Sequence, residues 1–157
     1  MSRYPITYSI GIIIICTSIW ACKEELVEEP LPENTEIELQ HPDYFPNNIA
    51  SPSDNPLTEK GVALGRMLFY ENQLSLDGSI SCASCHQQSK AFTDGEQFST
   101  GVNGTIGVKN AMSLANLHWT SRFFWDGRSE SLEDQALQPI SDPTEMNLPI
   151  EEAVVRL

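Results

Sequence analysis

Positive charge is scarce in this sequence. The 157 residues include 9 Lys and Arg against 22 Asp and Glu, and the formal net charge is −13. Seven of the acidic residues lie between Lys23 and Glu38, together with two prolines and no hydrophobic periodicity. This stretch is typical of a solvated spacer. No basic cluster is present that would bind nucleic-acid phosphates, so the sequence excludes nucleic acid as a partner.

Cysteine and histidine are also few, with 4 and 3 residues. Cys16 and Cys22 fall in an N-terminal leader, so only Cys82 and Cys85 remain for the folded part. Two thiols cannot make the disulfide framework of a small secreted protein. A structural zinc site needs four protein ligands, and no second CxxC or close His pair is present to supply them.

Long apolar runs are absent as well. A membrane-spanning helix needs about 20 apolar residues, whereas the longest run here covers only residues 10–20. Arg3 precedes this run and Ala21-Cys22 follows it, which is typical of an export signal. The mature chain is therefore expected to work outside the cytoplasm.

The end of the leader, Ala21-Cys22, resembles a bacterial lipobox, in which the cysteine is lipidated and becomes the new N-terminus. We predict a lipoprotein-type signal peptide over residues 1–21 and lipidation of Cys22. A plain secretory signal or an uncleaved anchor is the alternative. The lipid would hold a periplasm-facing or cell-surface lipoprotein of a bacterium to its membrane.

Two regions follow the leader: an acidic tether and lead-in over residues 22–54, and a folded domain over residues 55–157. Capping residues and helical spacing predict helices in four places. These are Pro56 to about Tyr70 with Asn55 as N-cap, a short helix at the cysteines capped by Ser79 or Ser81, Ser129 to Gln138 closed by Pro139, and Pro149 to Leu157. The first helix is expected to bury one face. Ala91 to Asn110 is predicted to be a long ordered loop, and no strand-like alternation is present, so the class is mainly α.

The motif Cys82-x-x-Cys85-His86 has the spacing at which two thiols form thioethers to one haem while the adjacent imidazole binds the iron. A Cys82–Cys85 disulfide, half of a zinc site or a chance match are the alternatives. In an exported chain with no spare cysteines, we interpret the motif as a c-type haem attachment site.

The second axial position of such a haem decides between electron transfer and activation of peroxide or oxygen. His41 and His118 are expected to be surface or packing residues. Met67 is expected in the core of the first helix, Met112 follows the loop and Met146 lies in a polar turn. None of these has a spacing that identifies an axial ligand.

From Asn55 onward the sequence resembles the N-terminal half of the bacterial di-haem cytochrome c peroxidases, including their MauG-like members. Four segments, about two thirds of the chain, carry the resemblance: NPLTEKGVALGRMLFYENQLS, SCASCHQQSKAFTDG, FFWDGRSESLEDQALQPI and DPTEMN. The resemblance implies a cytochrome c-like haem domain that reduces hydrogen peroxide to water. The electrons would come from a small redox protein of the cytochrome c or cupredoxin type.

The resemblance also implies residue roles. His86 matches the proximal ligand of the peroxidatic haem, and Trp125 matches a tryptophan that passes electrons between the two haems. Gln135 and Glu145 match the distal pair, and Asn110 matches an asparagine that helps to hold calcium. These roles suit the side chains, because a carboxylate in a dry site can shuttle a proton and an amide can orient peroxide. Read singly, the same residues are a helix-surface amide, a solvated turn carboxylate, a core tryptophan and a turn residue.

Two departures from the family pattern shape the expectations. Residues 87–117 contain no histidine to cap the resting haem, so we predict a five-coordinate or water-bound iron at rest. The chain also has one CxxCH and about half the family's length. We expect a fragment of a longer protein with a second haem; a split gene or a lone domain are the alternatives. A non-catalytic electron-transfer cytochrome, a MauG-like protein oxidase and a haem-free interaction module remain as other functions, and a homo-oligomer is compatible with each.

Overall fold

The computed structural model describes residues 34–46 and 52–157, all of which belong to one unit of the chain, Pro32–Leu157. The predicted signal peptide over residues 1–21, the lipidation of Cys22 and the first part of the tether lie outside the described residues. Within the described part, no helix has both the length and the apolar content needed to cross a membrane.

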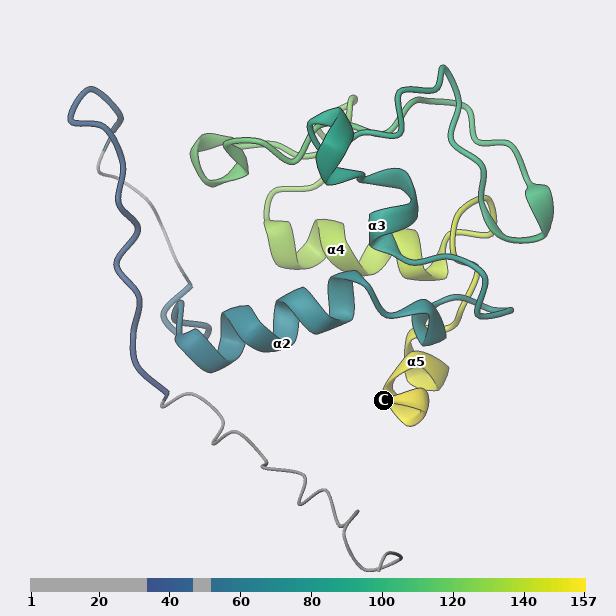
Figure 1. Ribbon diagram of the computed structural model, residues 1–157, viewed down its shortest axis with the longest axis horizontal. Coiled ribbons are helices and arrows are strands. Elements are labelled where there is room, and N and C mark those ends of the chain that lie inside the picture. The colour runs from purple at the N-terminus through teal and green to yellow at the C-terminus, as the bar shows by residue number, and fades with distance from the viewer. Residues whose placement is uncertain (1–33, 47–51) are drawn as a thin grey trace, which may run out of the picture. The chain divides into compact units, whose positions relative to one another are not determined.

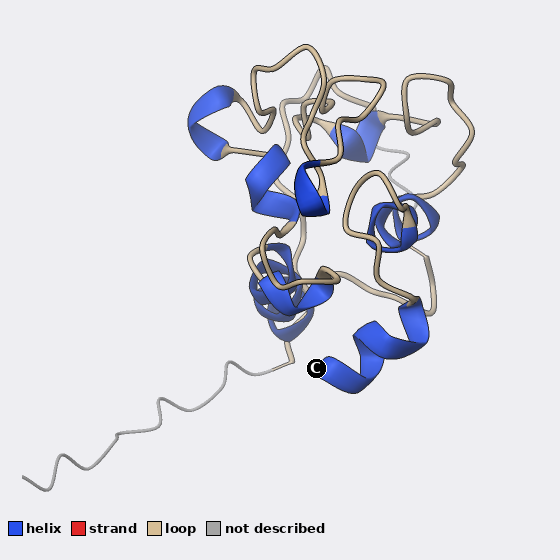
Figure 2. Ribbon diagram, turned by 90° about the vertical axis from the view of Figure 1, so that its right-hand side faces the viewer, coloured by secondary structure: helices blue, strands red, loops and turns tan. Residues whose placement is uncertain are grey.

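Helices joined by long loops make up the described part of the chain, as Figure 2 shows. The α-helices are α2 (Glu59–Phe69), α3 (Cys82–Cys85), α4 (Leu132–Ser141) and α5 (Ile150–Arg156), labelled in Figure 1. Short 3-10 helices occupy Asn72–Leu74, Gln88–Lys90, Val102–Gly104 and Leu117–Trp119. Among the described residues, β pairing is limited to four isolated antiparallel bridges. The prediction of a mainly α domain with long loops is therefore confirmed.

Helix α2 begins later than predicted. Its N-cap is Thr58, whose hydroxyl accepts a hydrogen bond from the Gly61 N–H at 3.1 Å, and Glu59 is the first helical residue. The predicted N-cap at Asn55 is wrong. Both residue types favour N-caps, and Thr58 has the extended backbone that lets its side chain reach back to the first turn.

The prediction that α2 buries one face is largely wrong. No residue of α2 is fully buried, and Leu68 is the member of the helix that packs, half-buried, against the core. Met67, predicted as a core residue, is 71% exposed. Successive residues are about 100° apart around a helix, so Met67 cannot face the core that Leu68 contacts.

Helix α4 continues past the proline that was predicted to close it. Ser131 is its N-cap, accepting from the Asp134 N–H at 3.0 Å, and the helix contains Pro139 and ends at Ser141. The carbonyl of Pro139 accepts a hydrogen bond from the Met146 N–H at 3.1 Å. This bond from the following turn stabilises the end of the helix, where carbonyls lack helical partners.

A small core lies where α5 meets the segment after α2. Leu74, Met146, Leu148 and Ala153 form the buried cluster, and Ile80 and Cys82 pack against it. Met146 lies in a polar turn, as predicted, yet its side chain is only 4% exposed. Arg156 fastens α5 in place by donating to the Ser75 carbonyl at 2.8 Å.

The described part of the lead-in contacts the domain. Thr35 accepts a hydrogen bond from the Glu59 N–H at 2.9 Å, and the Trp119 indole donates to the Pro46 carbonyl at 3.2 Å. His41 and His118 both pack edge-on against the Trp119 ring, with centroids 6.0 and 5.4 Å away. The prediction that these two histidines are surface or packing residues is confirmed.

Candidate haem site

Helix α3 carries the two cysteines of the CxxCH motif. Ser84 accepts a hydrogen bond from the Ser81 N–H at 3.0 Å, which fixes the start of this four-residue helix. Of the two predicted caps, Ser81 is therefore the N-cap. Residues three apart in a helix share a face, so Cys82 and Cys85 point to one side. Both are free and partly buried.

His86 follows α3 directly and has one ring nitrogen already engaged. Its Nδ1 lies 2.9 Å from the carbonyl oxygen of Phe92. With Nδ1–H donating to that carbonyl, the unprotonated Nε2 is left free to bind a metal ion. A hydrogen bond of this kind fixes the orientation and tautomer of a metal-binding histidine.

The loop after His86 is shaped to deliver that carbonyl. Ala91 and Phe92 have φ angles of 56° and 60°, a left-handed conformation that side chains other than Gly, Asn and Asp rarely adopt. The Phe92 N–H and the Thr93 carbonyl both bond to Gln87 and close the loop. The strained backbone is therefore held by the loop's own hydrogen bonds.

An open cavity of about 530 Å³ adjoins His86. It is lined by Tyr70, Ala83, His86, Gln87, Gln88 and Ser89. A second cavity of about 320 Å³ shares Tyr70 and Gln88 with the first and adds Arg66, Phe69 and Phe92. Two thiols on one face, an oriented imidazole and a neighbouring aromatic-lined cavity fit a covalently bound haem.

The electrostatics of the two thiols favour thioethers over a metal–thiolate site. Burial raises the pKa of Cys82, and burial together with the charges of Asp94 and Glu145 raises the pKa of Cys85 to about 11. A zinc ligand must be a thiolate, which this environment disfavours, whereas a thioether carries no charge. In the part of the chain that the structure describes, no three His, Cys, Asp or Glu residues form a group able to hold a metal ion.

Glu145 lies in the turn after α4 and is half-buried. Burial is the main reason that the pKa of Glu145 is raised; the nearby Asp142 charge adds to the rise and Arg128 opposes it. The Glu145 charge also acts on both thiols, raising the pKa of Cys82 and of Cys85. The structure thus places the Glu145 charge within electrostatic range of the two cysteines, although Glu145 is 60 residues away in sequence from Cys85.

Gln135 is a half-buried residue of α4. Its side chain makes no hydrogen bond to another described residue, so the amide is free to bind a ligand. The backbone holds it firmly, with the Gln135 N–H donating to the Ser131 carbonyl at 3.1 Å. Gln135 and Glu145 come from one continuous segment, the helix and its following turn.

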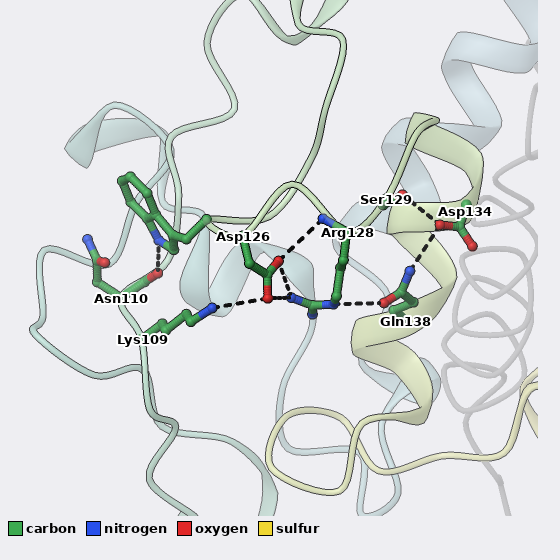
Figure 3. Close-up of polar contacts among 8 residues, drawn as sticks. Lys109, Asn110, Asp126, Arg128, Ser129, Asp134 and Gln138 are labelled. Carbon is green, nitrogen blue, oxygen red and sulfur yellow. Dashed lines mark hydrogen bonds and ion pairs between the residues drawn. The ribbon is translucent and has the colours of Figure 1, made fainter.

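Trp125 and Asn110 meet, although they are 15 residues apart. The Trp125 indole N–H donates to the Asn110 backbone carbonyl at 3.0 Å. The side-chain amide of Asn110 points away from this bond, as Figure 3 shows. The Trp125 side chain is exposed, with 58% of its surface accessible. The alternative interpretation of Trp125, as an ordinary core residue, is therefore wrong.

A chain of polar contacts next to Trp125 was not anticipated from the sequence (Figure 3). Asp126 binds Lys109 at 3.3 Å and Arg128 at 3.0 and 3.1 Å, and Arg128 donates to Gln138 of α4 at 3.2 Å. Gln138 in turn donates to Asp134 at 3.0 Å. The Arg128 guanidinium also lies 3.4 Å above the Phe124 ring centre. The sequence WDGR, an Asp-Gly turn followed by Arg, is the one local pattern that could have indicated this network.

Comparison with known proteins agrees with this arrangement. The family model described as di-haem cytochrome c peroxidase matches residues 59–157. The methylamine utilization protein MauG of Methylorubrum extorquens is 42% identical over 112 residues, covering 71% of this chain and 32% of that protein. The cytochrome c peroxidase Ccp of Escherichia coli is 36% identical over 121 residues, covering 70% of this chain and 26% of that protein.

A solved structure is similar as well. The crystal structure of a MauG-like protein associated with microbial copper homeostasis matches with a TM-score of 0.70 and 39% identity, over 76% of this chain and 36% of that one. The chain thus spans about a third or less of the curated relatives named above. The match of the family model over residues 59–157, with 42% identity to a relative over 71% of this chain, shows that the chain belongs to the di-haem cytochrome c peroxidase family.

Proposed function

We propose that this chain is the peroxidatic part of an enzyme that reduces hydrogen peroxide to water with electrons from a small redox protein. One observation carries the proposal. The His86 ring, held through Nδ1, directly follows two haem-attachment thiols, and the charge of a half-buried carboxylate, Glu145, acts on both of those thiols. A protonatable group near the haem favours peroxide cleavage over simple electron transfer, because cleavage needs a proton to be moved.

The residues that hold the cofactor are those of the CxxCH motif. Cys82 and Cys85 attach haem c through thioethers, and the Nε2 of His86 binds the iron. Haem c bound there would supply an iron able to activate peroxide. The Phe92 carbonyl makes the His86 imidazole a stronger electron donor, because it accepts a hydrogen bond from Nδ1–H, with 2.9 Å between Nδ1 and the carbonyl oxygen.

Glu145 and Gln135 act on the peroxide. Glu145 takes the proton from one peroxide oxygen and returns it to the other, which leaves as water. Its raised pKa suits this exchange, since a proton shuttle works best with a pKa near the operating pH. Gln135 orients the peroxide with an amide that donates a hydrogen bond without changing charge.

Electrons reach the site through Trp125. Its exposed indole suits a relay to a second haem, which we expect in the full-length protein, and its N–H is fixed by Asn110. The Asn110 side-chain oxygen remains available for calcium, a cation that binds amide and backbone oxygens. The electron donor is a cytochrome c or cupredoxin, and the protein is exported and anchored through Cys22.

Replacing Asp126 by Asn in the full-length enzyme should slow electron delivery to the His86 haem several-fold. Asp126 links Lys109 to Arg128 and so holds the turn that presents Trp125. Stability should change little, because exposed ion pairs contribute about 1 kcal/mol or less. Stopped-flow re-reduction after one peroxide turnover measures the step.

The matched control replaces Arg122 by Gln, which removes another exposed ion pair, with Glu130. Equal rates in both variants and the wild type would contradict the prediction.

The haem held by His86 should be high-spin at rest. No histidine is present in residues 87–117, and His41 and His118 both pack on Trp119. Electron paramagnetic resonance of the oxidised protein measures the spin state. A low-spin signal with two histidine ligands at this haem would show that another histidine binds it.

Oxidation of a protein side chain is the second candidate function. Its support is the 42% identity with the methylamine utilization protein MauG and the similarity to a MauG-like structure. Both functions use the same Cys82, Cys85 and His86, and differ in what consumes the oxidising power.

The experiment that tests the proposed function uses the full-length protein purified from its native membranes. Intact mass and haem content give the number of haems for each chain, and peroxide turnover is followed with a reduced cytochrome c and with a reduced cupredoxin. Turnover with either donor supports the peroxidase. A haem-loaded protein that neither consumes peroxide nor reacts with it spectroscopically would leave electron transfer as its function.

A further inference from the structure

We propose that Gly101, Val102 and Asp142 are positioning residues that clamp Glu145 beside the haem-attachment cysteines. This inference rests on the proposed function, because it concerns the residue assigned there to proton transfer. Gly101 and Val102 belong to the middle of the long loop over residues 91–110, whose assigned roles so far fall at its two ends, at Phe92 and at Lys109 and Asn110.

The backbone of Glu145 is fixed on both sides. Its carbonyl accepts a hydrogen bond from the Val102 N–H at 2.8 Å, and its own N–H donates to the Asp142 carbonyl at 3.0 Å. The next residue, Met146, is anchored in the core with 4% of its surface exposed, and its carbonyl accepts from the Leu76 N–H at 2.9 Å. Little freedom remains for the peptide units that carry the carboxylate.

Gly101 allows the loop to approach this closely. A Cβ atom at residue 101 would lie 2.2 Å from the Thr144 carbonyl oxygen and 2.7 Å from that of Glu145. Both neighbours are backbone atoms, so no side chain can swing aside. The φ of Gly101 is −89°, an ordinary value for any residue. Glycine is therefore required here for the contact and not for the backbone conformation.

The loop side of the clamp is rigid. Gly101 donates its N–H to the Thr105 carbonyl at 2.7 Å, and Thr105 donates back to the Val102 carbonyl at 3.1 Å. An antiparallel bridge between Thr100 and Ile106 closes the same turn. Val102 is buried, with 1% of its surface exposed. The loop thus has the internal bonds and the buried anchor that a positioning element needs.

Asp142 organises the other side of the clamp. Its carboxylate accepts from both the N–H and the hydroxyl of Thr144 at 2.7 Å, and its carbonyl accepts from the N–H groups of Glu145 and Asn147 at 3.0 Å. Asp142 therefore sets the path of the turn that carries Glu145. Burial is the main cause of the raised pKa of Glu145; the charge of Asp142 adds to the rise and Arg128 opposes it.

The test is a double-mutant analysis of peroxide cleavage in the full-length, haem-loaded protein. Gly101→Ala should keep haem content and the proximal-histidine spectrum but slow cleavage about 10- to 100-fold, because a displacement of about 1 Å can cost that much. Asp142→Ala, at a partly exposed residue, tests the clamp independently if Gly101→Ala fails to fold. Gly65→Ala is the matched control, since a Cβ there would meet nothing within 4 Å, and it should react at the wild-type rate.

Combination with Glu145→Gln distinguishes positioning from general damage. If Gly101 and Asp142 act through Glu145, adding Gly101→Ala or Asp142→Ala to Glu145→Gln should cause no further loss. Two results would overturn the clamp but not the proton role of Glu145, given that Glu145→Gln itself is slow. Either Gly101→Ala and Asp142→Ala cleave peroxide at the wild-type rate, or their losses multiply with that of Glu145→Gln in the double variants. A wild-type rate in Glu145→Gln would overturn the clamp together with the proton role of Glu145.

Discussion

A full-length chain in which Cys82 and Cys85 are both replaced by Ala is expected to lose the covalently bound haem of this domain. The two thiols lie on one side of α3 and are the free cysteines of the described chain. Alanine is a good helix former, so α3 itself should persist. The measurement is intact mass combined with a haem stain after denaturing electrophoresis, which detects only haem that is covalently attached.

Two controls sharpen this prediction. His118→Gln removes a histidine that packs on Trp119 and should leave the haem content unchanged. Metal analysis of the unmodified protein tests the zinc alternative directly, because iron should be found and zinc should not. Retention of the full haem complement by the double cysteine variant would show that the motif is not the attachment site.

The haem-attachment motif was predictable because it is local. A short helix followed by histidine needs only residues 81–86, and Ser81 caps it as one of the two expected residues. The contact that orients His86 was not predictable, since it depends on left-handed φ angles at Ala91 and Phe92, residue types that disfavour them. Local patterns predict His86 as the ligand, and a strained loop supplies its hydrogen-bond partner.

The helices were predictable in existence but not in their limits or burial. Asn55 and Thr58 are both good N-cap residues. The structure pairs Thr58 with Glu36, a residue more than 15 positions away from either candidate, and local sequence does not show that pairing. Pro139 remains inside α4 because the turn beyond it donates hydrogen bonds back to the helix end. Apolar spacing shows which residues of α2 can be buried, but not which surface covers them.

The surroundings of Glu145 were the least predictable part of the site. Family resemblance pointed to the carboxylate, whereas the contact of Gly101 with residues 144 and 145 joins segments more than 40 residues apart. A glycine in a loop usually indicates a turn, and only the structure shows that Gly101 is needed for close approach. The same holds for Arg128, whose partner Gln138 lies on another element.

Glu145→Gln in the full-length protein is expected to slow peroxide cleavage by about 10²- to 10⁴-fold, the usual contribution of a positioned acid–base group. Gln has nearly the same shape and can accept hydrogen bonds, but it cannot take a proton. Rapid mixing of the oxidised protein with peroxide measures the step without the electron donor. Haem content should not change, since Glu145 is not part of the CxxCH motif.

The pH dependence of the same reaction tests the mechanism behind this loss. Glu145 must be ionised to accept a proton, so the wild-type rate should fall as the pH drops through its pKa, which burial and Asp142 raise above 4.5. Asp142→Asn keeps the oxygen that binds Thr144 but removes the charge, so the fall should move to lower pH. In Glu145→Gln the fall should disappear.

The Glu145→Gln substitution should lower the rate of peroxide cleavage without lowering the thermal stability of the protein. Because the pKa of Glu145 is raised on folding, its neutral form stabilises the folded state below the unfolded-state pKa, and this contribution is lost as the pH rises through the folded-state pKa. At neutral pH the Gln substitution removes a half-buried charge, so thermal unfolding should occur at an equal or higher temperature. A variant that is slow, stable and insensitive to acid has lost a proton shuttle, whereas one that is slow because it unfolds has lost only structure.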